Sequence, residues 1–484
     1  MEEFYNRYRE LDILKEKYDY LKNGELCILY GRRRIGKTAL VLKFLESVKT
    51  KKLYFYTNKL TRKGLMDQFS KDISNQTNDN IKISESWDSF FDYIEDESSK
   101  EKLVLIIDEF QRFSKISEDF ITILQYRWDI KLKNRKVMII LLGSSMGMTH
   151  NLVFSSKGPL YGRHTIKMKI KPFRYIDFRQ MFSYLKSEEE KINHYAVLGG
   201  TAHYLTLAKN LNKNLFGIID NLILTEGSPL YDEPITLLSS ELKSYSRHNS
   251  ILISIARGNK EMKAFATTLG LEQTQITPHI DHLTNKLDLV RKTVPFFGKK
   301  RKTRYELDDN FFKFWYRFVF PNKSTLELKN KQIIQEKIKQ QFNKYVSFIF
   351  EDIIKELLIL YNMGKIKNLK INFEKIGSWW ENDEEIDIVA YSKRELLLGE
   401  VKWKNKPLNG LTILNKLKQK SKKLNFSGRI RYMLFLKNGF SEDTKEILEK
   451  EDVLCLDLNE IENLFNGASK KESSKQRTLS AYRN

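Results

Sequence analysis

Apolar residues in the first third of the chain gather in short runs, separated by segments with helical spacing. Continuous runs predict strands buried on both faces at residues 26–30, 53–57, 103–107 and 137–142, and residues 166–170 are a candidate fifth strand. Residues 7–22 and 39–45 have the spacing of amphipathic helices. Strands that alternate with helices indicate an α/β domain with a parallel sheet over about the first 170 residues.

The pattern changes in the rest of the chain. Residues 175–226 are helical in spacing, residues 240–310 predict three helices and a β-hairpin, and residues 330–364 are again helical. Short apolar runs in the last third predict strands at residues 385–390, 396–401, 431–436 and 453–456. The polar stretch at residues 469–484 is expected to be frayed.

A glycine-bounded loop follows the first predicted strand and opens the next helix. Its residues are Gly31, Arg32, Arg33, Arg34, Ile35, Gly36, Lys37 and Thr38, a complete Walker A motif. The glycines let backbone N–H groups curve around phosphates, and the helix N-terminus favours negative charge. Lys37 is placed to reach the β- and γ-phosphates, and Thr38 to bind Mg²⁺. The loop predicts an ATP site that uses Mg²⁺.

The third predicted strand ends in two acidic residues, as a Walker B strand does. Asp108 is placed to enter the Mg²⁺ shell, and Glu109 to polarise the attacking water. The alternative is an ordinary strand followed by acidic loop residues. The fourth strand ends at Ser144 and Ser145, and either hydroxyl is at the position of a γ-phosphate sensor. Glu109, with Lys37, is a predicted catalytic residue.

An arginine in a glycine turn is a further candidate for ATP binding. Arg163 follows Gly162 in the turn at residues 158–163. Such an arginine can stabilise transition-state charge in its own subunit or across an interface between subunits. A solvated loop arginine is the ordinary alternative.

Residues 262–307 have the element order of a winged helix. Two helices, at 262–269 and 274–287, precede strands at 289–293 and 304–307. In that arrangement the second helix reads DNA and the hairpin contacts phosphates. The candidate DNA contacts are Thr277, His279 and Lys286 on the helix, with Lys299, Lys300, Arg301 and Lys302 in the hairpin. The alternative is a protein-interaction module, because the helix carries few positive charges.

A second chemical constellation lies in the last third of the chain. Asp387 is on one predicted strand, and Glu400 and Lys402 share a face of the next, because alternate strand residues point the same way. Two carboxylates and a lysine at one edge can hold Mg²⁺ and activate water for phosphodiester cleavage. These three residues are therefore candidate catalytic residues. Solvated strand ends are the alternative.

Net charge, cysteine content and the length of apolar stretches indicate which partners and which cellular compartment to expect. The formal net charge is +22 in 484 residues, which favours nucleic acid or an anionic membrane surface as partner. A lysine-rich chain can also reflect the base composition of its genome. Cys27 and Cys455 each lie in an apolar run and suit a reducing cytosol. No apolar stretch approaches ~20 residues. We expect a cytoplasmic protein with DNA as partner and no membrane association.

The motifs together resemble the archaeal-type ATPase family, P-loop proteins of the AAA and STAND-like branch. The likeness is carried by residues 4–11, 31–38, 107–110, 142–145, 159–163 and 172–173. Residues 199–205 look like the family's lid motif, with Ala202 where proline is usual. Residues 308–316 and 377–380 look like the C-terminal domain often fused to these ATPases. The resemblance implies ATP and Mg²⁺ as cofactors, and a homo-oligomer formed through the ATPase domain.

The carboxylate constellation resembles the core of the PD-(D/E)XK nucleases. The positions of Asp387, Glu400 and Lys402 match that core, and Glu351 on the preceding helix matches its accessory glutamate. The resemblance implies a metal site made by Asp387, Glu400 and Glu351. Many relatives of this fold have lost activity, so cleavage and binding both remain open.

We interpret the chain as an α/β protein with an ASCE P-loop ATPase core, a helical lid, a winged helix and a restriction-endonuclease-like domain. The predicted boundaries are 1–172, 173–235, 236–325 and 330–465, followed by a flexible tail at 466–484. The leading function is a DNA-associated protein that binds and hydrolyses ATP, and a nucleotide-gated nuclease is an open extension of it. The alternative is a STAND-like signalling or scaffold ATPase with an inactive nuclease-like domain that binds protein or DNA. Salt-sensitive DNA binding would favour the first function.

Overall fold

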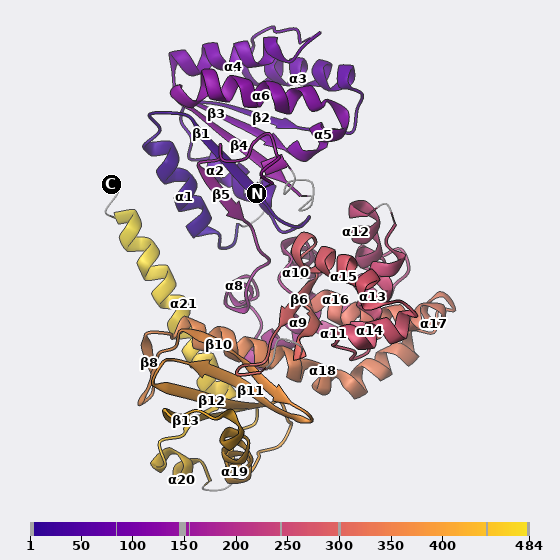
Figure 1. The fold of residues 1–484 in the computed structure, drawn as a ribbon, viewed down its shortest axis with the longest axis vertical. Helices are drawn as coiled ribbons and strands as arrows, with labels where there is room; N and C mark the ends of the chain where they lie inside the picture. The colour runs from indigo at the N-terminus through magenta and orange to yellow at the C-terminus, as the bar shows by residue number, and fades with distance from the viewer. Residues whose placement is uncertain are drawn as a thin grey trace. The chain divides into compact units, whose positions relative to one another are not determined.

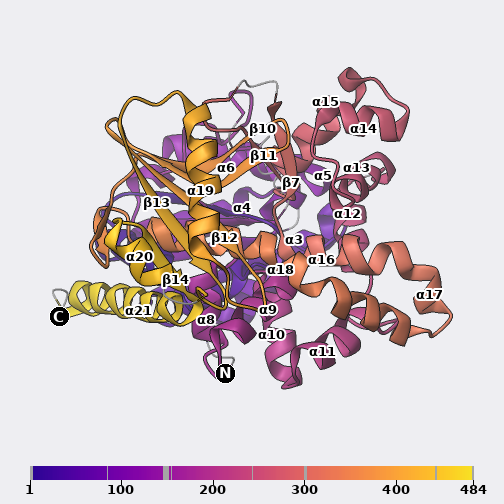
Figure 2. The ribbon, with the colours of Figure 1, turned by 90° about the horizontal axis from the view of Figure 1, so that it is seen from below.

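The computed structural model describes residues 4–83, 85–144, 152–153, 155–242, 244–298, 302–441 and 444–481, with side chains as far as residue 471. The chain divides into two compact units, which we describe separately. The first unit consists of residues 1–172, 201–203 and 285–288, and the second of residues 173–200, 204–284 and 289–484. Figures 1 and 2 show the elements of each unit in two views.

The first unit contains a five-stranded sheet with the order β2-β3-β4-β1-β5, in which every pairing is parallel. The strands are β1 (Glu25–Tyr30), β2 (Lys51–Tyr56), β3 (Leu103–Asp108), β4 (Val137–Gly143) and β5 (Ile166–Lys169). All residues of β3 and β4 are buried, as central strands covered on both faces should be. The predicted α/β fold with a parallel sheet is confirmed.

Helices cover both faces of this sheet (Figure 1). One apolar cluster joins a face of the sheet to α3 (Arg62–Thr77), α4 (Asp88–Lys100) and α6 (Glu118–Ile130). A second cluster joins the other face to α1 (Tyr8–Asp19) and α2 (Lys37–Leu45). Alternate strand residues belong to the two clusters because successive side chains point to opposite faces. The buried strands thereby hold the loops at their carboxyl ends in fixed positions.

After Pro172 the chain is helical up to residue 241. The helices are α8 (Tyr175–Met181), α9 (Glu188–Leu198), α10 (Ala202–Leu211), α11 (Leu215–Ile218) and α12 (Glu233–Glu241). The start of α9 follows from local chemistry, because the Ser187 hydroxyl accepts a hydrogen bond from the Glu190 backbone N–H at 3.1 Å. Three glutamates in its first turn complement the helix dipole.

Three helices and a hairpin follow in the predicted order. They are α13 (Ser246–Ala256), α14 (Met262–Leu269), α15 (Gln273–Asp281) with the π-helical turn η5 (His282–Lys286), and the antiparallel strands β6 (Val290–Thr293) and β7 (Arg304–Leu307). Gly270 ends α14 at φ 62°, a left-handed conformation that glycine adopts without steric cost. The chain continues through α16 (Asn310–Phe314) and α17 (Lys323–Glu327) into α18 (Lys331–Leu360).

The second unit also contains a five-stranded mixed sheet with the order β10-β11-β12-β13-β14. The strands are β10 (Lys375–Glu381), β11 (Glu384–Tyr391), β12 (Glu395–Lys402), β13 (Arg429–Leu436) and β14 (Leu454–Asp457). The first three strands pair antiparallel and the last three parallel. Helix α19 (Gly410–Ser421) lies on one face and α18 on the other (Figures 1 and 2). The remaining helix between strands is α20 (Thr444–Lys450).

Three regions of the chain differ from the sequence prediction. Strand β10 was not predicted, because Gly377 and Ser378 interrupt its apolar pattern and a bulge follows Gly377. The small hairpin of β8 (Gly364–Ile366) and β9 (Leu369–Ile371) was also missed. Where a flexible tail was predicted from residue 466, helix α21 (Leu458–Ala481) continues, since its lysines, glutamates and alanines favour a helix.

The longest helices contain too many charged residues to cross a membrane. Helix α18 has 30 residues, with lysines and glutamates along its length. Within the described ranges, no helix combines the length and the apolar character needed to cross a bilayer.

Candidate functional site

The glycine-bounded loop joins the end of β1 to the start of α2. Gly36 precedes α2 at φ 92°, a conformation that favours glycine. A Cβ atom on Gly31 would lie 2.3 Å from the carbonyl oxygen of Ile170, so only glycine fits there. The predicted Walker A sequence therefore forms a tight loop between a parallel strand and a helix N-terminus. This is the setting in which backbone N–H groups bind phosphates.

The loop lysine is buried and turned into the loop. Lys37 is 6% exposed, and its Nζ donates to the carbonyl oxygens of Gly31 at 2.9 Å and Arg32 at 2.8 Å. A buried ammonium needs such acceptors. Phosphate oxygens offer the same Nζ stronger, charged acceptors. The lysine is thus placed inside the curve that the phosphates would occupy.

Two residues outside the Walker A motif hold this loop by its backbone. Arg7 donates from Nη2 to the carbonyl oxygen of Ile35 at 3.2 Å. The backbone N–H of His203 donates to the carbonyl oxygen of Arg34 at 3.1 Å. Arg7 lies in a predicted helix and both segments carry the family resemblance, but neither pattern indicates a contact with the loop.

Asp108 connects the Walker B strand to the Walker A helix. Its Oδ2 accepts from the Thr38 hydroxyl at 2.7 Å and from the Tyr54 phenol at 2.9 Å, and its Oδ1 accepts from the Glu109 backbone N–H at 2.8 Å. Burial and the Asp108 charge raise the pKa of Tyr54, so the phenol stays protonated and donates. A hydroxyl beside a carboxylate is the oxygen donor set that Mg²⁺ prefers, so Thr38 and Asp108 fit the predicted ion.

Three donors converge on one oxygen of Glu109. Its Oε2 accepts from the Ser144 hydroxyl at 2.8 Å and from Gln111 Nε2 at 2.9 Å, and Arg112 Nη2 lies 3.3 Å away. Gln111 Nε2 also lies 3.2 Å from Ser144 Oγ. The predicted catalytic carboxylate and the predicted sensor serine are therefore in direct contact. Ser145, the other sensor candidate, lies outside the described residues.

Gln111 and Arg112 were not predicted as site residues. Both belong to η1 (Phe110–Arg112), the single turn that follows Glu109. Glu109 itself has φ 57°, a left-handed conformation that is uncommon outside glycine. That reversal brings the following turn back beside the carboxylate. The only available signal was the closeness of these residues to Glu109 in the sequence.

Arg163 forms an ion pair with a carboxylate of the first unit. Its Nη2 lies 2.7 Å from Asp129 Oδ2 on α6, and its Nε donates to the same carboxylate at 2.9 Å. The hydrogen bond from Arg163 lowers the pKa of Asp129. Asp129 and Arg163 therefore form a two-point contact, and the role of Arg163 in ATP binding stays a prediction.

The three predicted residues of the second constellation do lie together. Lys402 Nζ is 3.0 Å from Asp387 Oδ2 and 2.5 Å from Glu400 Oε2. The Val401 backbone N–H donates to Asp387 Oδ2 at 2.9 Å. The antiparallel pairing of β11 with β12 brings these residues onto adjacent strands, as the alternation predicted. We call Asp387, Glu400, Lys402 and Lys420 the carboxylate–lysine cluster.

Lys420 is the member of this cluster that the sequence did not reveal. It lies on α19, and its Nζ contacts Glu400 Oε1 and donates to the Glu385 carbonyl oxygen at 2.7 Å. Both oxygens of Glu400 are thus engaged by ammonium groups. Burial and the Asp387 charge raise the pKa of Glu400. Burial alone would lower the pKa of Lys402, but Asp387 and Glu400 outweigh it and raise that pKa.

The arrangement of this cluster does not fit a metal ion. The charges of the two carboxylates are matched by two ammonium groups, and a divalent cation would be repelled by both. Burial and the Asp387 charge raise the pKa of Glu351, which favours its neutral form. In the part of the chain that the structure describes, no three His, Cys, Asp or Glu side chains form a metal-binding group. We derive no catalytic step through a metal here.

Two family models match most of the chain. Residues 4–208 match an "ATPase domain predominantly from Archaea", and residues 315–422 match "Archaea bacterial proteins of unknown function". Uncharacterized protein MJECL04 of Methanocaldococcus jannaschii is 33% identical over 459 residues, which cover 94% of this chain and 98% of that protein. This chain belongs to that family of archaeal ATPase-domain proteins. Its first unit is an ATPase domain with a P-loop.

Two further similarities cover shorter parts of the chain. "Uncharacterized ATP-binding protein MJ0423" of Methanocaldococcus jannaschii is 53% identical over 49 residues, which cover 10% of this chain and 81% of that protein. The Walker-type ATPase paby2304 of Pyrococcus abyssi superposes with a TM-score of 0.52 at 19% identity, covering 65% of this chain and 96% of that chain. At that identity the likeness shows the fold alone.

The predicted DNA contacts differ in how exposed their side chains are and in what those side chains contact. Thr277 is exposed on α15, although its hydroxyl donates to the Gln273 carbonyl oxygen at 2.8 Å. His279 faces His248 on α13, with 3.3 Å between Nδ1 and Nε2. Lys286 ends the turn η5 and is partly exposed. The hairpin residues Lys299, Lys300 and Arg301 lie outside the described residues.

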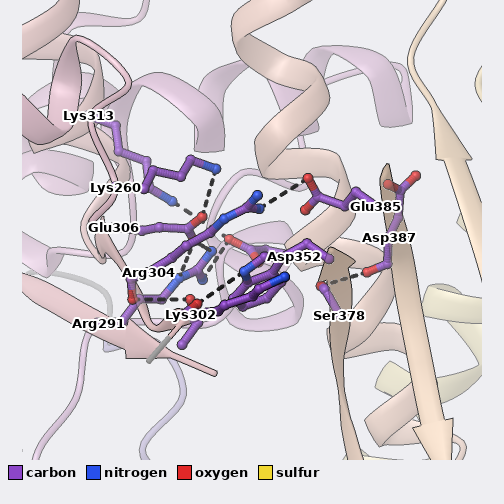
Figure 3. Close-up of polar contacts among 12 residues, drawn as sticks. Lys260, Arg291, Lys302, Arg304, Glu306, Lys313, Asp352, Ser378, Glu385 and Asp387 are labelled. Atoms are coloured by element: carbon purple, nitrogen blue, oxygen red, sulfur yellow. Dashed lines mark hydrogen bonds and ion pairs between the residues drawn. The ribbon is translucent and has the colours of Figure 1, made fainter. Parts of the chain in front are cut away.

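The described part of the hairpin docks onto the mixed sheet. Lys302 pairs with Glu381 at 3.0 Å. Arg304 pairs with Glu385 at 3.2 Å (Figure 3). The Arg304 guanidinium also lies over the Trp380 ring, 4.5 Å from its centroid. The predicted phosphate contact Lys302 is therefore already paired with a carboxylate of β10.

A second ionic network fixes the base of the same hairpin. Arg291 on β6 lies 2.8 Å from Glu306 on β7 and 2.8 Å from Asp352 on α18 (Figure 3). Lys260 pairs with Glu306 at 2.9 Å. Burial opposes ionisation of Glu306, but Arg291 and Lys260 outweigh it and lower its pKa to about 2. The hairpin is thus held at its base and along its second strand.

Proposed function

We propose that this protein binds and hydrolyses ATP in its first unit and does so in association with DNA. The observation that carries hydrolysis is the contact between Glu109 and Ser144, beside an Asp108–Thr38 pair. Thr38 and Asp108 would hold Mg²⁺, which would neutralise phosphate charge. Lys37 binds the β- and γ-phosphates, Glu109 accepts the proton of the attacking water, and Ser144 senses the γ-phosphate.

The test is steady-state ATP hydrolysis by the full chain, with and without duplex DNA. Ser144→Ala should slow turnover by about tenfold or more, because it removes a donor that orients Glu109. Ser114→Ala is a matched control, since its hydroxyl donates to the backbone carbonyl oxygen of Gln111, three residues earlier, at 2.8 Å. Equal rates for wild type and Ser144→Ala would remove Ser144 from the catalytic group.

Association with DNA is supported by the net charge of +22 and by the basic hairpin that follows α15. Phosphate contacts release counterions, so affinity for duplex DNA should fall steeply as salt is raised. Neutralising Lys299, Lys300, Arg301 and Lys302 together should weaken binding to all sequences alike. Nucleotide-dependent oligomerisation without any DNA affinity would instead favour the signalling or scaffold ATPase.

For the carboxylate–lysine cluster we propose a binding module and not a nuclease. The support is the pairing of both Glu400 oxygens with Lys402 and Lys420. Metal-dependent cleavage is the second candidate, because Asp387, Glu400 and Lys402 meet on adjacent strands. Incubation of single- and double-stranded DNA with Mg²⁺ or Mn²⁺, with and without ATP, separates the two. Cleavage that Asp387→Ala abolishes while ATP turnover persists would establish the nuclease.

A further inference from the structure

Gln111 has a buried side-chain amide whose nitrogen is hydrogen-bonded and whose oxygen has no donor among the described residues. Its side chain is almost fully buried, at 2% exposed. Nε2 lies 2.9 Å from Glu109 Oε2 and 3.2 Å from Ser144 Oγ. A carboxylate only accepts hydrogen bonds, so the nitrogen must be the end that faces Glu109. Among the described residues, no donor reaches the amide oxygen Oε1, which is itself buried.

A count of the available hydrogen-bond donors shows that, within the described part of the chain, none is left for Gln111 Oε1. Both hydrogens of Nε2 are used by Glu109 and Ser144, and the single Ser144 hydroxyl hydrogen is donated to Glu109 at 2.8 Å. The donors that the described residues supply to Glu109 all reach Oε2. Two acceptors therefore remain on neighbouring side chains, Oε1 of Glu109 and Oε1 of Gln111. A buried acceptor without a donor is costly, and such sites normally hold water.

A water molecule that attacks phosphorus must be both oriented and deprotonated. It has two hydrogens, and two acceptors fix the direction of its lone pair. We propose that Gln111 orients the attacking water through Oε1, while Glu109 Oε1 accepts the proton that the water loses. This inference rests on the proposed ATP hydrolysis. It assigns a reacting contact to a residue that otherwise only connects Glu109 with Ser144.

The chemical step is balanced with these groups alone. The water oxygen forms a bond to the γ-phosphorus as the bond from that phosphorus to the β–γ bridging oxygen breaks. ADP leaves with the bond's electron pair, and the water's remaining hydrogen stays on the product phosphate. The proton on Glu109 is released to solvent after the products leave. Gln111 gains and loses no proton, because an amide oxygen acts here only as an acceptor.

The test compares ATP binding and turnover in the full chain for wild type, Gln111→Met, Gln111→Asn and the control Gln68→Met. Gln68 donates to the Tyr56 carbonyl oxygen at 2.8 Å at the surface of the same unit. For both Gln111 variants we expect kcat to fall on the order of 10²-fold with the Kd for Mg·ATP changed less than about threefold. Gln68→Met should keep both values.

Each outcome decides the question. A kcat within about threefold of wild type in both Gln111 variants would overturn the proposal. Weakened ATP binding and a lowered melting temperature in both variants, in step with kcat, would also overturn it by making Gln111 a structural residue. Absence of turnover in wild type and Gln68→Met alike would overturn hydrolysis itself, and this inference with it. Loss confined to the Gln111 variants supports it.

Discussion

Each unit places a pair of carboxylates on, or directly after, strands of its five-stranded sheet, and the groups that contact each pair are of different kinds. In the first unit, Asp108 accepts from two hydroxyls and one backbone N–H, and Glu109 accepts from a hydroxyl and an amide, with one guanidinium at 3.3 Å. In the second unit, Lys402 contacts both carboxylates and Lys420 contacts one of them.

The two carboxylate pairs differ mainly in the charge of the groups that contact them. Neutral donors fix the direction of a carboxylate and leave most of its charge available to a cation or a proton. Ammonium groups fix the direction and cancel the charge at the same time. In our proposal the first pair, with Arg112 as its one cationic neighbour among the described residues, is prepared for Mg²⁺ and water, whereas two ammonium groups balance the second pair. Four changes can break or sharpen this contrast.

The largest effect is expected from Glu109→Gln. The amide keeps the size of the side chain but cannot accept a proton, so ATP turnover should fall on the order of 10³-fold. Binding of Mg·ATP should stay within about threefold, because the phosphate and metal contacts remain. Single-turnover hydrolysis and nucleotide titration measure the two quantities. Turnover at the wild-type rate would show that another group is the base.

Lys37→Ala should weaken ATP binding on the order of 10²-fold, since it removes the cation in the curve of the loop. Lys43→Ala is the matched control, because Lys43 lies on the same helix and pairs only at the surface with Glu46. Titration with a fluorescent ATP analogue measures both. Equal affinities for the two variants would contradict the assignment of Lys37.

Lys420→Met should raise the affinity of the carboxylate–lysine cluster for Mn²⁺ by roughly tenfold or more over wild type, because it removes one ammonium from Glu400. Lys418→Met is the control, since Lys418 pairs with Glu451 at 3.0 Å and does not contact the cluster. Isothermal titration without nucleotide measures the binding. Unchanged affinity in Lys420→Met would mean that charge balance does not govern this site.

The smallest effect is expected at the hairpin. Replacing both Glu381 and Glu385 by Gln frees Lys302 and Arg304, and exposed ion pairs contribute at most about 1 kcal/mol each, so DNA affinity should rise by roughly 2–5-fold. Glu384→Gln is the control, because Glu384 lies beside Glu385 on β11 and pairs with Lys423 instead of the hairpin. Fluorescence anisotropy at low salt compares them. If Glu384→Gln raised the DNA affinity by the same factor, the effect would come from the change in net charge and not from freeing Lys302 and Arg304.

Sequence patterns predicted what depends on neighbouring residues along the chain. Buried strands, the phosphate loop and the shared face of Glu400 and Lys402 follow from local composition and alternation. Tyr54 and Lys420 could not be predicted in this way, because their contacts depend on which strand neighbours β3 and where α19 packs. The pairing of Lys302 with Glu381 likewise joins residues 79 positions apart.

Manganese binding measures the contrast between the two carboxylate pairs directly. Electron paramagnetic resonance of the full chain with Mn²⁺, with and without a non-hydrolysable ATP analogue, reports whether the ion needs nucleotide. We predict tight Mn²⁺ binding only with the analogue, lost in Asp108→Asn and retained in Asp387→Asn. Tight binding without nucleotide that Asp387→Asn abolishes would contradict this account.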